Sequence, residues 1–300
     1  MSGHDSDVAR AREVLEAGGL VAIPTETVYG LAALISHAEA VRRIFAVKGR
    51  PVDHPLIVHV ADVGRARVLS RNWTPAAERL ATRFWPGPLT LVVERSRDVD
   101  PVVSGGLDTV AIRCPAHSMT LELLRSLSVP VAAPSANRFG RVSPTSARHV
   151  LDDLGADVDF VLDGGDCEVG LESTIVDCTV DPVQILRPGA ITEEEIRVVL
   201  NATAPAAGPS RASGMLESHY APRCRVVATS DREEARRLSS QPKARLIDTA
   251  HDPESAARSL YADLRRCDAD GITEAVVLLP PATGIGLALR DRVLKAAAGR

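Results

Sequence analysis

The sequence has 300 residues, of which 45% are apolar, 25% are charged and only 3% are aromatic, so aliphatic side chains must build its core. Its formal net charge of −4 argues against a protein that holds nucleic acid by bulk charge, and any anionic ligand must meet a focused basic site. The length fits one large domain and a smaller one.

The cysteines and the apolar runs indicate the cellular compartment in which the protein works. The cysteines are scattered, odd in number and without a CxxC pair, which disfavours both a zinc site and a disulfide framework: Cys114, Cys167, Cys178, Cys224 and Cys267. The N-terminus is polar and has no apolar signal region, and no stretch approaches about 18 uninterrupted apolar residues. We therefore expect a cytoplasmic protein without a membrane-spanning helix.

The first two thirds of the chain alternate helical and extended patterns. Apolar residues at helical spacing predict a helix over 7–17 and a second one within 38–51 that ends in a basic loop. Short apolar runs predict strands at 20–27, broken by Pro24, and at 56–60 and 89–94. Further strands follow at 109–115, 129–137, 160–165, 173–179 and 184–189. Because these strands end repeatedly in polar or Gly/Pro loops, the pattern indicates an α/β domain with its site at the strand ends.

The last third has a different organisation. Residues 202–213, "ATAPAAGPSRAS", lack periodicity and are rich in Ala, Pro, Ser and Gly, as linkers are. Beyond them, strands near 225–229, 244–249 and 274–280 alternate with helical stretches. We predict a first domain at 1–201, a linker at 202–223 and a small α/β domain at 224–300.

Several strand-end loops carry basic side chains. Lys48 and Arg50, in "KGRP", suit phosphate oxygens, although a solvated helix end is an alternative. His59 lies in an apolar strand, where a histidine is usually a core residue. Thr109 and Arg113 are four positions apart and share one strand face. A buried arginine needs an anion: Asp108 or Asp177 of the chain, or a ligand carboxylate.

Hydroxyl groups gather on other loops. Ser135, Asn137 and Ser143 follow an apolar strand and suit a phosphate or a ribose, although a polar surface turn would have the same composition. Glu172, Ser173 and Thr174 begin one strand, and Arg187 ends another. The sequence has no GxSxG, no Walker-type phosphate loop and no Cys/His metal set. This combination favours a nucleotide-binding or adenylating cleft that works by positioning and charge stabilisation.

The ordered motifs closely resemble the YrdC-like threonylcarbamoyl-AMP synthases. They are "PTETVYGL", "KGRP", "HPLIVHV", "WPGPLT", "GLDTVAIRCPAH", "PVAAPSAN", "SPT", "ESTIVD" and "LRPGAIT", and they cover roughly residues 8–200. "SGMLESHYAP" at 213–222 and "GIGLALRDR" near the end look like the family's long form. The resemblance implies a twisted open mixed sheet with a concave active-site face, and a small C-terminal Rossmann-like α/β domain.

The resemblance also implies a reaction. L-threonine, bicarbonate or CO2 and ATP would give threonylcarbamoyl-AMP and pyrophosphate, and a tRNA threonylcarbamoyl transferase would take the product. Mg²⁺ would arrive with ATP, without a metal site made by the protein and without a covalent protein nucleophile.

By motif, the resemblance assigns two sets of residues. Those expected to contact threonine are Thr27, His59, Arg113, Ala133 and Ser173. Those expected to hold ATP are Lys48, Arg50, His54, Thr109, Ser135, Asn137, Ser143, Arg187 and, as part of a linker that closes as a lid, Tyr220. Glu26 has two candidate roles: it orients a basic residue of the phosphate site, or it handles the proton lost when the threonine amine becomes a carbamate.

The sequence departs from the family pattern in two places, and two other readings compete. His54 stands where the family commonly has Asn, and Glu217 and Ser218 stand where it has a basic or aromatic residue. A module that binds double-stranded RNA without chemistry would need a broad basic surface, which the acidic charge balance disfavours. The related carbamoyl-transfer domain of hydrogenase maturation proteins would need CxxC zinc fingers and an acylphosphatase-like module, which the sequence lacks.

Overall fold

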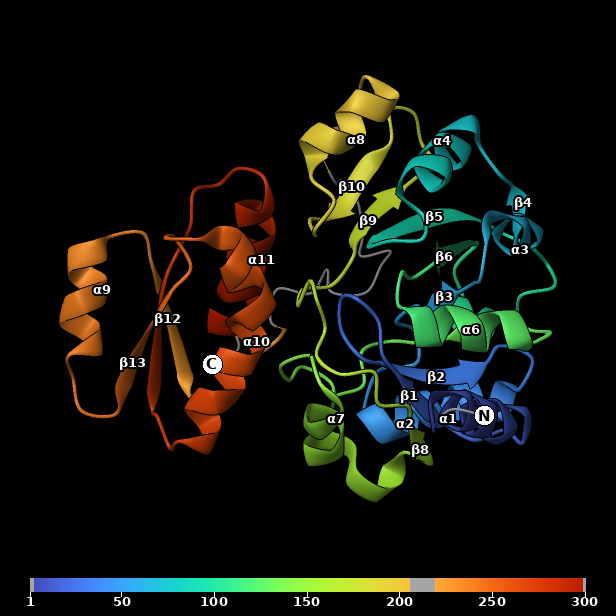
Figure 1. Cartoon of the computed structure of the whole chain (residues 1–300). Helices are drawn as coiled ribbons and strands as arrows, with labels where there is room; N and C mark the ends of the chain where they lie inside the picture. Colours follow the sequence, from blue (N-terminus) through green and yellow to red (C-terminus); the bar gives the residue numbers. More distant parts are fainter. Residues whose placement is uncertain (1–2, 206–218, 299–300) are drawn as a thin grey trace.

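The computed structural model describes residues 3–205 and 219–298. These residues form two sheets, one of eleven strands and one of three. Figure 1 shows the large sheet and its helices, coloured blue to yellow, beside a small orange and red domain. The predicted α/β architecture with a mixed sheet and a separate C-terminal domain is confirmed.

The large sheet runs in the order β11-β10-β9-β5-β6-β3-β7-β2-β1-β8, with β4 paired to β5. Its strands are β1 (Val21–Ile23), β2 (Gly30–Leu34), β3 (Ile57–His59), β4 (Ser70–Asn72), β5 (Leu89–Arg95), β6 (Thr109–Arg113), β7 (Val131–Ala132), β8 (Phe160–Val161), β9 (Thr174–Asp177), β10 (Gln184–Arg187) and β11 (Ala204–Pro205). Its helices are α1 (Gly3–Glu16), α2 (Ala38–Lys48), α3 (Val63–Val68), α4 (Pro75–Phe84), α5 (Pro101–Ser104), α6 (Ser118–Ser126), α7 (Ala147–Leu154), a 3₁₀ helix (Gly155–Asp157) and α8 (Glu193–Leu200). The large sheet therefore reaches residue 205, while most of the predicted linker lies outside the described residues.

The small domain is a three-stranded parallel sheet in the order β12-β14-β13. Its strands are β12 (Arg225–Thr229), β13 (Ala244–Asp248) and β14 (Glu274–Leu278), and its helices are α9 (Arg232–Ser239), α10 (Pro253–Ala269) and α11 (Ile285–Ala297). In Figure 1, α10 and α11 lie on the side that faces the large domain, and α9 lies on the far side. One apolar cluster joins α10 and α11 to Val28, Val142 and Leu171, so the two domains share a core.

Strand register places the residues that matter for the site. In the antiparallel pair β5 and β6, Thr90 lies opposite Arg113, and in the parallel pair β3 and β6, His59 lies opposite Arg113. These three side chains therefore form one row across neighbouring strands.

The end of α2 positions the basic loop. Ala40, Val41, Ile44 and Phe45 are buried on one helix face, and Gly49 ends the helix with φ of 63°, a left-handed conformation that glycine adopts without strain. The chain turns sharply there and brings Arg50 back against the domain, because the Arg50 N–H bonds to the carbonyl oxygen of Phe45 at 3.0 Å.

No helix within residues 3–205 and 219–298 has the length and apolar character needed to cross a lipid bilayer.

Candidate active site

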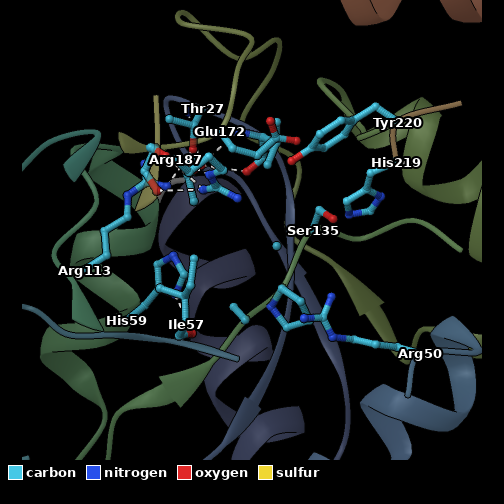
Figure 2. A pocket seen from close by; sticks show the side chains of 16 residues that line it. Thr27, Arg50, Ile57, His59, Arg113, Ser135, Glu172, Arg187, His219 and Tyr220 are labelled. Atoms are coloured by element: carbon cyan, nitrogen blue, oxygen red, sulfur yellow. Dashed lines mark hydrogen bonds between the residues drawn. The ribbon is translucent and has the colours of Figure 1, made fainter. Parts of the chain in front are cut away.

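A cavity lies where loops at the strand ends of the large domain meet residues 219 and 220. All five residues predicted for threonine line it, together with four of those predicted for ATP: Thr27, His59, Arg113, Ala133, Ser173, Arg50, Ser135, Arg187 and Tyr220. Figure 2 shows Arg113 and His59 at one end, and Arg50 and His219 at the other. The cavity therefore has two ends of different composition, each with an arginine.

The loop after β1 is held by its own hydroxyl groups. The Thr25 hydroxyl donates to the carbonyl oxygen of Val28 at 2.6 Å and lies 2.8 Å from the Thr27 hydroxyl. It also accepts the backbone N–H groups of Thr27 and Val28. This polarity at the end of a buried strand fixes the loop so that Thr27 lines the cavity.

Arg113 meets a carboxylate that the sequence did not identify as its partner. Its guanidinium lies 2.8 Å from Glu26 Oε1, donates to the Thr27 hydroxyl at 2.7 Å and to the Gly87 carbonyl oxygen at 3.3 Å. The expected chain partners, Asp108 or Asp177, were therefore wrong, because the loop after β1 brings Glu26 closer. Glu26 also accepts the Ala116 N–H at 3.1 Å. It orients a basic residue of the threonine set, not one of the phosphate set.

His59 is buried beside Arg113 and stays neutral. Burial and, to a smaller extent, the neighbouring Arg113 charge lower its pKa to about 3, because both disfavour the imidazolium. Its Nδ1 lies 3.2 Å from the Ile57 carbonyl oxygen. His59 therefore offers the cavity a neutral polar ring, not a third positive charge.

Ser173 contacts Thr90 of β5 and Arg187 of β10. Its hydroxyl lies 2.7 Å from that of Thr90, and the Arg187 guanidinium donates to the Ser173 carbonyl oxygen at 2.9 and 3.1 Å. Arg187 is fully buried, and burial lowers its pKa from the ordinary arginine value. A buried guanidinium held in this way suits an anionic ligand in the adjoining space.

The side chains of Lys48 and Arg50 are buried, although the loop residues between and after them are exposed, so the alternative of two solvated cations at a helix end is wrong. Lys48 Nζ donates to the carbonyl oxygens of Ser135 and Asn137 at 2.5 and 2.6 Å, and Arg50 donates to that of Pro55 at 3.1 Å. Burial lowers the pKa of Lys48 well below its usual value and that of Arg50 to about 10. These cations hold the loops around the Arg50 end of the cavity.

The loop 135–143 is also buried in part, so it is not a surface turn. Asn137 Nδ2 donates to the carbonyl oxygens of Arg138 and Arg141 at 2.8 and 2.9 Å, which closes the loop on itself. The Ser143 hydroxyl donates to Glu172 Oε1 at 2.6 Å. Asn137 and Ser143 thus support the wall of the cavity without lining it.

A row of rings borders the Arg50 end. The His54 ring lies 5.6 Å from Phe139, Phe139 lies 5.7 Å from His219, and His219 stacks on Tyr220 at 4.3 Å. Arg50 lies over the Phe139 ring at 5.8 Å. Planar rings and a guanidinium form a surface on which a nucleobase can stack.

The remaining predicted residues lie outside the cavity lining. Lys48, His54, Asn137 and Ser143 border it through the contacts above, and Thr109 lies at the other end of β6 from Arg113. The sequence reasoning missed Thr25 and His219 and gave Glu172 no role, although all three line the cavity. His219 stood beside Tyr220 in the quoted "HYAP" segment, which was the available signal. Glu217 and Ser218 lie outside the described residues.

Family models match nearly the whole chain. A model for the Sua5, YciO and YrdC proteins, described as "Telomere recombination", matches residues 13–189. A second, described as "Threonylcarbamoyl-AMP synthase, C-terminal domain", matches residues 191–298. The second match includes α8, whose Ile196 belongs to the core of the large domain.

Known relatives span the same length. The threonylcarbamoyl-AMP synthase of Pyrococcus abyssi is 40% identical, with 94% of this chain and 92% of the relative covered. That of Bacillus subtilis is 38% identical, with 100% and 95% covered. A crystal structure of P. abyssi Sua5 complexed with L-threonine superposes with a TM-score of 0.93 at 39% identity, covering 98% of this chain and 94% of that one.

Proposed function

The chain belongs to the threonylcarbamoyl-AMP synthases, transferases that make a threonine-derived adenylate for tRNA modification, and we propose that its cavity joins L-threonine, bicarbonate or CO2, and ATP. The products are threonylcarbamoyl-AMP and pyrophosphate. The observation that carries this proposal is one cavity with Arg113 and His59 at one end and Arg50 with a row of rings at the other. Such a cavity suits an amino acid carboxylate beside a nucleotide.

At the threonine end, Arg113 is the partner for the substrate carboxylate. A guanidinium forms two parallel hydrogen bonds with a carboxylate, and Glu26 and Thr27 hold this one in place. Neutral His59 and the Thr27 hydroxyl then lie beside the amine and side chain of threonine. Neutral neighbours suit an amine that must lose its charge before it reacts.

The chemistry forms a carbamate and then an adenylate. The neutral amine nitrogen adds to the carbon of CO2 and loses one proton, which gives a carbamate. A carbamate oxygen forms a bond to the α-phosphorus of ATP, and the bond from that phosphorus to the bridging oxygen breaks, so that pyrophosphate leaves with the electron pair. Lys48, Arg50 and Arg187 supply positive charge for the phosphates, and the pre-set geometry lowers the barrier.

Magnesium enters this proposal as part of the MgATP substrate. Within the described parts of the chain, no group of three or more His, Cys, Asp or Glu side chains is placed to hold a metal ion. The residues present therefore fit an ion whose ligands are phosphate oxygens and water, which is common for Mg²⁺.

The product is a reactive mixed anhydride, which implies a second enzyme. We propose that a tRNA threonylcarbamoyl transferase consumes it, and that both enzymes work in the cytoplasm. All five cysteines of this chain are free, which fits a reducing compartment.

Pyrophosphate release tests the proposal. The purified protein, supplied with MgATP, should release pyrophosphate only when both threonine and bicarbonate are present, and the adenylate should be detectable by mass spectrometry. Omitting each component in turn is the control. Pyrophosphate release that ignores threonine, or none with all components present, would overturn the proposal.

A further inference from the structure

The C-terminal domain places an arginine directly against the wall of the active site. Arg292 lies on α11, and none of its side chain is exposed. Its Nε donates to Glu172 Oε2 at 2.8 Å, and its Nη2 donates to the Pro188 carbonyl oxygen at 3.0 Å. Both acceptors belong to the large domain, and each is a chain neighbour of a cavity residue, Ser173 or Arg187. Arg292 therefore bridges the segment before β9 and the segment after β10.

Glu172 is the centre of this contact. Besides Arg292, it accepts the Ser143 hydroxyl at 2.6 Å and the hydroxyl of Tyr261 on α10 at 2.7 Å. Burial would raise its pKa, but the charges of Arg292 and Arg187 hold it at about 2. A fully ionised carboxylate thus lines a cavity that is meant to receive a triphosphate.

Two cations, Arg292 and Arg187, lie near the Glu172 carboxylate, and Arg187 is also expected to bind ATP. Arg187 is in the set predicted for ATP phosphates, and it already contacts Ser173, the residue after Glu172. If Arg292 were absent, Glu172 would remain a buried negative charge with Arg187 as its nearest cation. It would draw Arg187 toward itself and repel the phosphates.

We propose that Arg292 is a positioning residue that neutralises Glu172 and so prevents this carboxylate from competing with the triphosphate of ATP for Arg187. This inference rests on the proposed function. Arg292 also lies over the ring of Tyr220, 5.2 Å from its centroid, so it packs against a second residue of the ATP set. In this assignment the C-terminal domain completes the charge balance of the active site.

A purely structural role for Arg292 is the rival explanation, and Arg265 provides a matched control. Arg265 lies on α10, and it too reaches the large domain, through the Val142 carbonyl oxygen and Asp153 at 2.9 Å. Both side chains of that ion pair are mostly buried. Arg265 therefore ties the domains together as Arg292 does, but through a carboxylate that does not line the cavity.

The experiment compares Arg292→Met, Arg265→Met, Glu172→Gln and the double variant Arg292→Met/Glu172→Gln. For each we would measure the KM values for ATP and threonine, the thermal midpoint, and the Kd of an ATP analogue with a methylene group between the α- and β-phosphates. Arg292→Met should raise the ATP KM and the analogue Kd about tenfold or more, with a smaller change for threonine. Arg265→Met should lower the thermal midpoint but leave the ATP KM within about twofold.

The double variant decides between charge and structure. Because the double variant also removes the Glu172 charge that Arg292→Met leaves unpaired, its ATP KM should return to within about twofold of that of Glu172→Gln. Equal losses in Arg292→Met and Arg265→Met, or no recovery in the double variant, would overturn the assignment. Lack of turnover in the unaltered protein would count against the proposed function instead, and binding of the analogue would still test Arg292.

Discussion

Replacement of Arg113 by Gln tests the threonine end of the cavity. Arg113 and Glu26 lie 2.8 Å apart, and their side chains are only 5% and 7% exposed. Gln keeps a hydrogen-bond donor but removes the charge, so it loses the charged pair with the threonine carboxylate. It also leaves Glu26 buried without its cation. The variant should therefore lose both threonine affinity and stability.

The two losses have different sizes. A hydrogen bond to a charged group contributes about 1.5–3 kcal/mol, which corresponds to an increase of about 10- to 150-fold in the threonine KM. Removal of one partner of a buried ion pair costs about 3–5 kcal/mol of folding free energy, or about 10 °C in the thermal midpoint of a chain of this size. The ATP KM should change by less than about threefold, because Arg50 lies at the opposite end of the cavity.

The double variant Arg113→Gln/Glu26→Gln separates these effects. Two amides can hydrogen-bond to each other, so most of the lost stability should return, as measured by thermal unfolding. The threonine KM, measured by pyrophosphate release at saturating ATP and bicarbonate, should stay high. Recovery of threonine affinity together with stability would refute the reasoning, because Arg113 would then matter only for the fold.

Three further changes test other parts of the site. Lys48→Met should raise the ATP KM about tenfold, because the carbonyl oxygens of Ser135 and Asn137 lose their shared donor; an unchanged ATP KM would contradict this. The folded-state pKa of His59 is about 3, below the unfolded value of about 6.5, so its contribution to stability is present above pH 6.5 and is lost as the pH falls. Between pH 7 and pH 5, urea unfolding should show that the free energy of unfolding falls by about 2 kcal/mol because of His59. The His59→Gln variant should lack this part of the pH dependence. Gly189→Ala would place a Cβ 2.3 Å from the Thr174 nitrogen and 2.6 Å from the Ser173 carbonyl carbon, so it should destabilise the fold by about 1–3 kcal/mol and raise both KM values; normal kinetics would contradict that.

The sequence predicted those features that depend on local patterns. Apolar runs that end in polar loops gave the strands and placed the site at their ends, as β1, β6 and β10 show. Alternation along β6 gave a buried Arg113, and register then placed it beside His59. The two-domain arrangement followed from a change in composition near residue 202.

Features that depend on long-range pairing were not accessible in this way. Arg113 had plausible partners nearby or on other strands, and only the folded loop after β1 selects Glu26. Glu172 was visible in a motif, but its cation comes from a helix near the other end of the chain. A helical arginine near the C-terminus has the same local pattern whether it is solvated or buried, so the motif "GIGLALRDR", which ends at Arg292, did not indicate the role of this residue.

The buried charges explain how a chain with a net charge of −4 can present a site for anions. The carboxylates Glu26 and Glu172 each face a guanidinium, that of Arg113 or Arg292. Arg50 lines the cavity and donates to the Pro55 carbonyl oxygen, which is neutral, and burial lowers its pKa because the charged form has left water. An anion in the cavity beside Arg50 restores the interaction that water no longer supplies. The folded chain can therefore bind a polyanion through buried, desolvated cations, and it does so without an excess of basic residues on the surface.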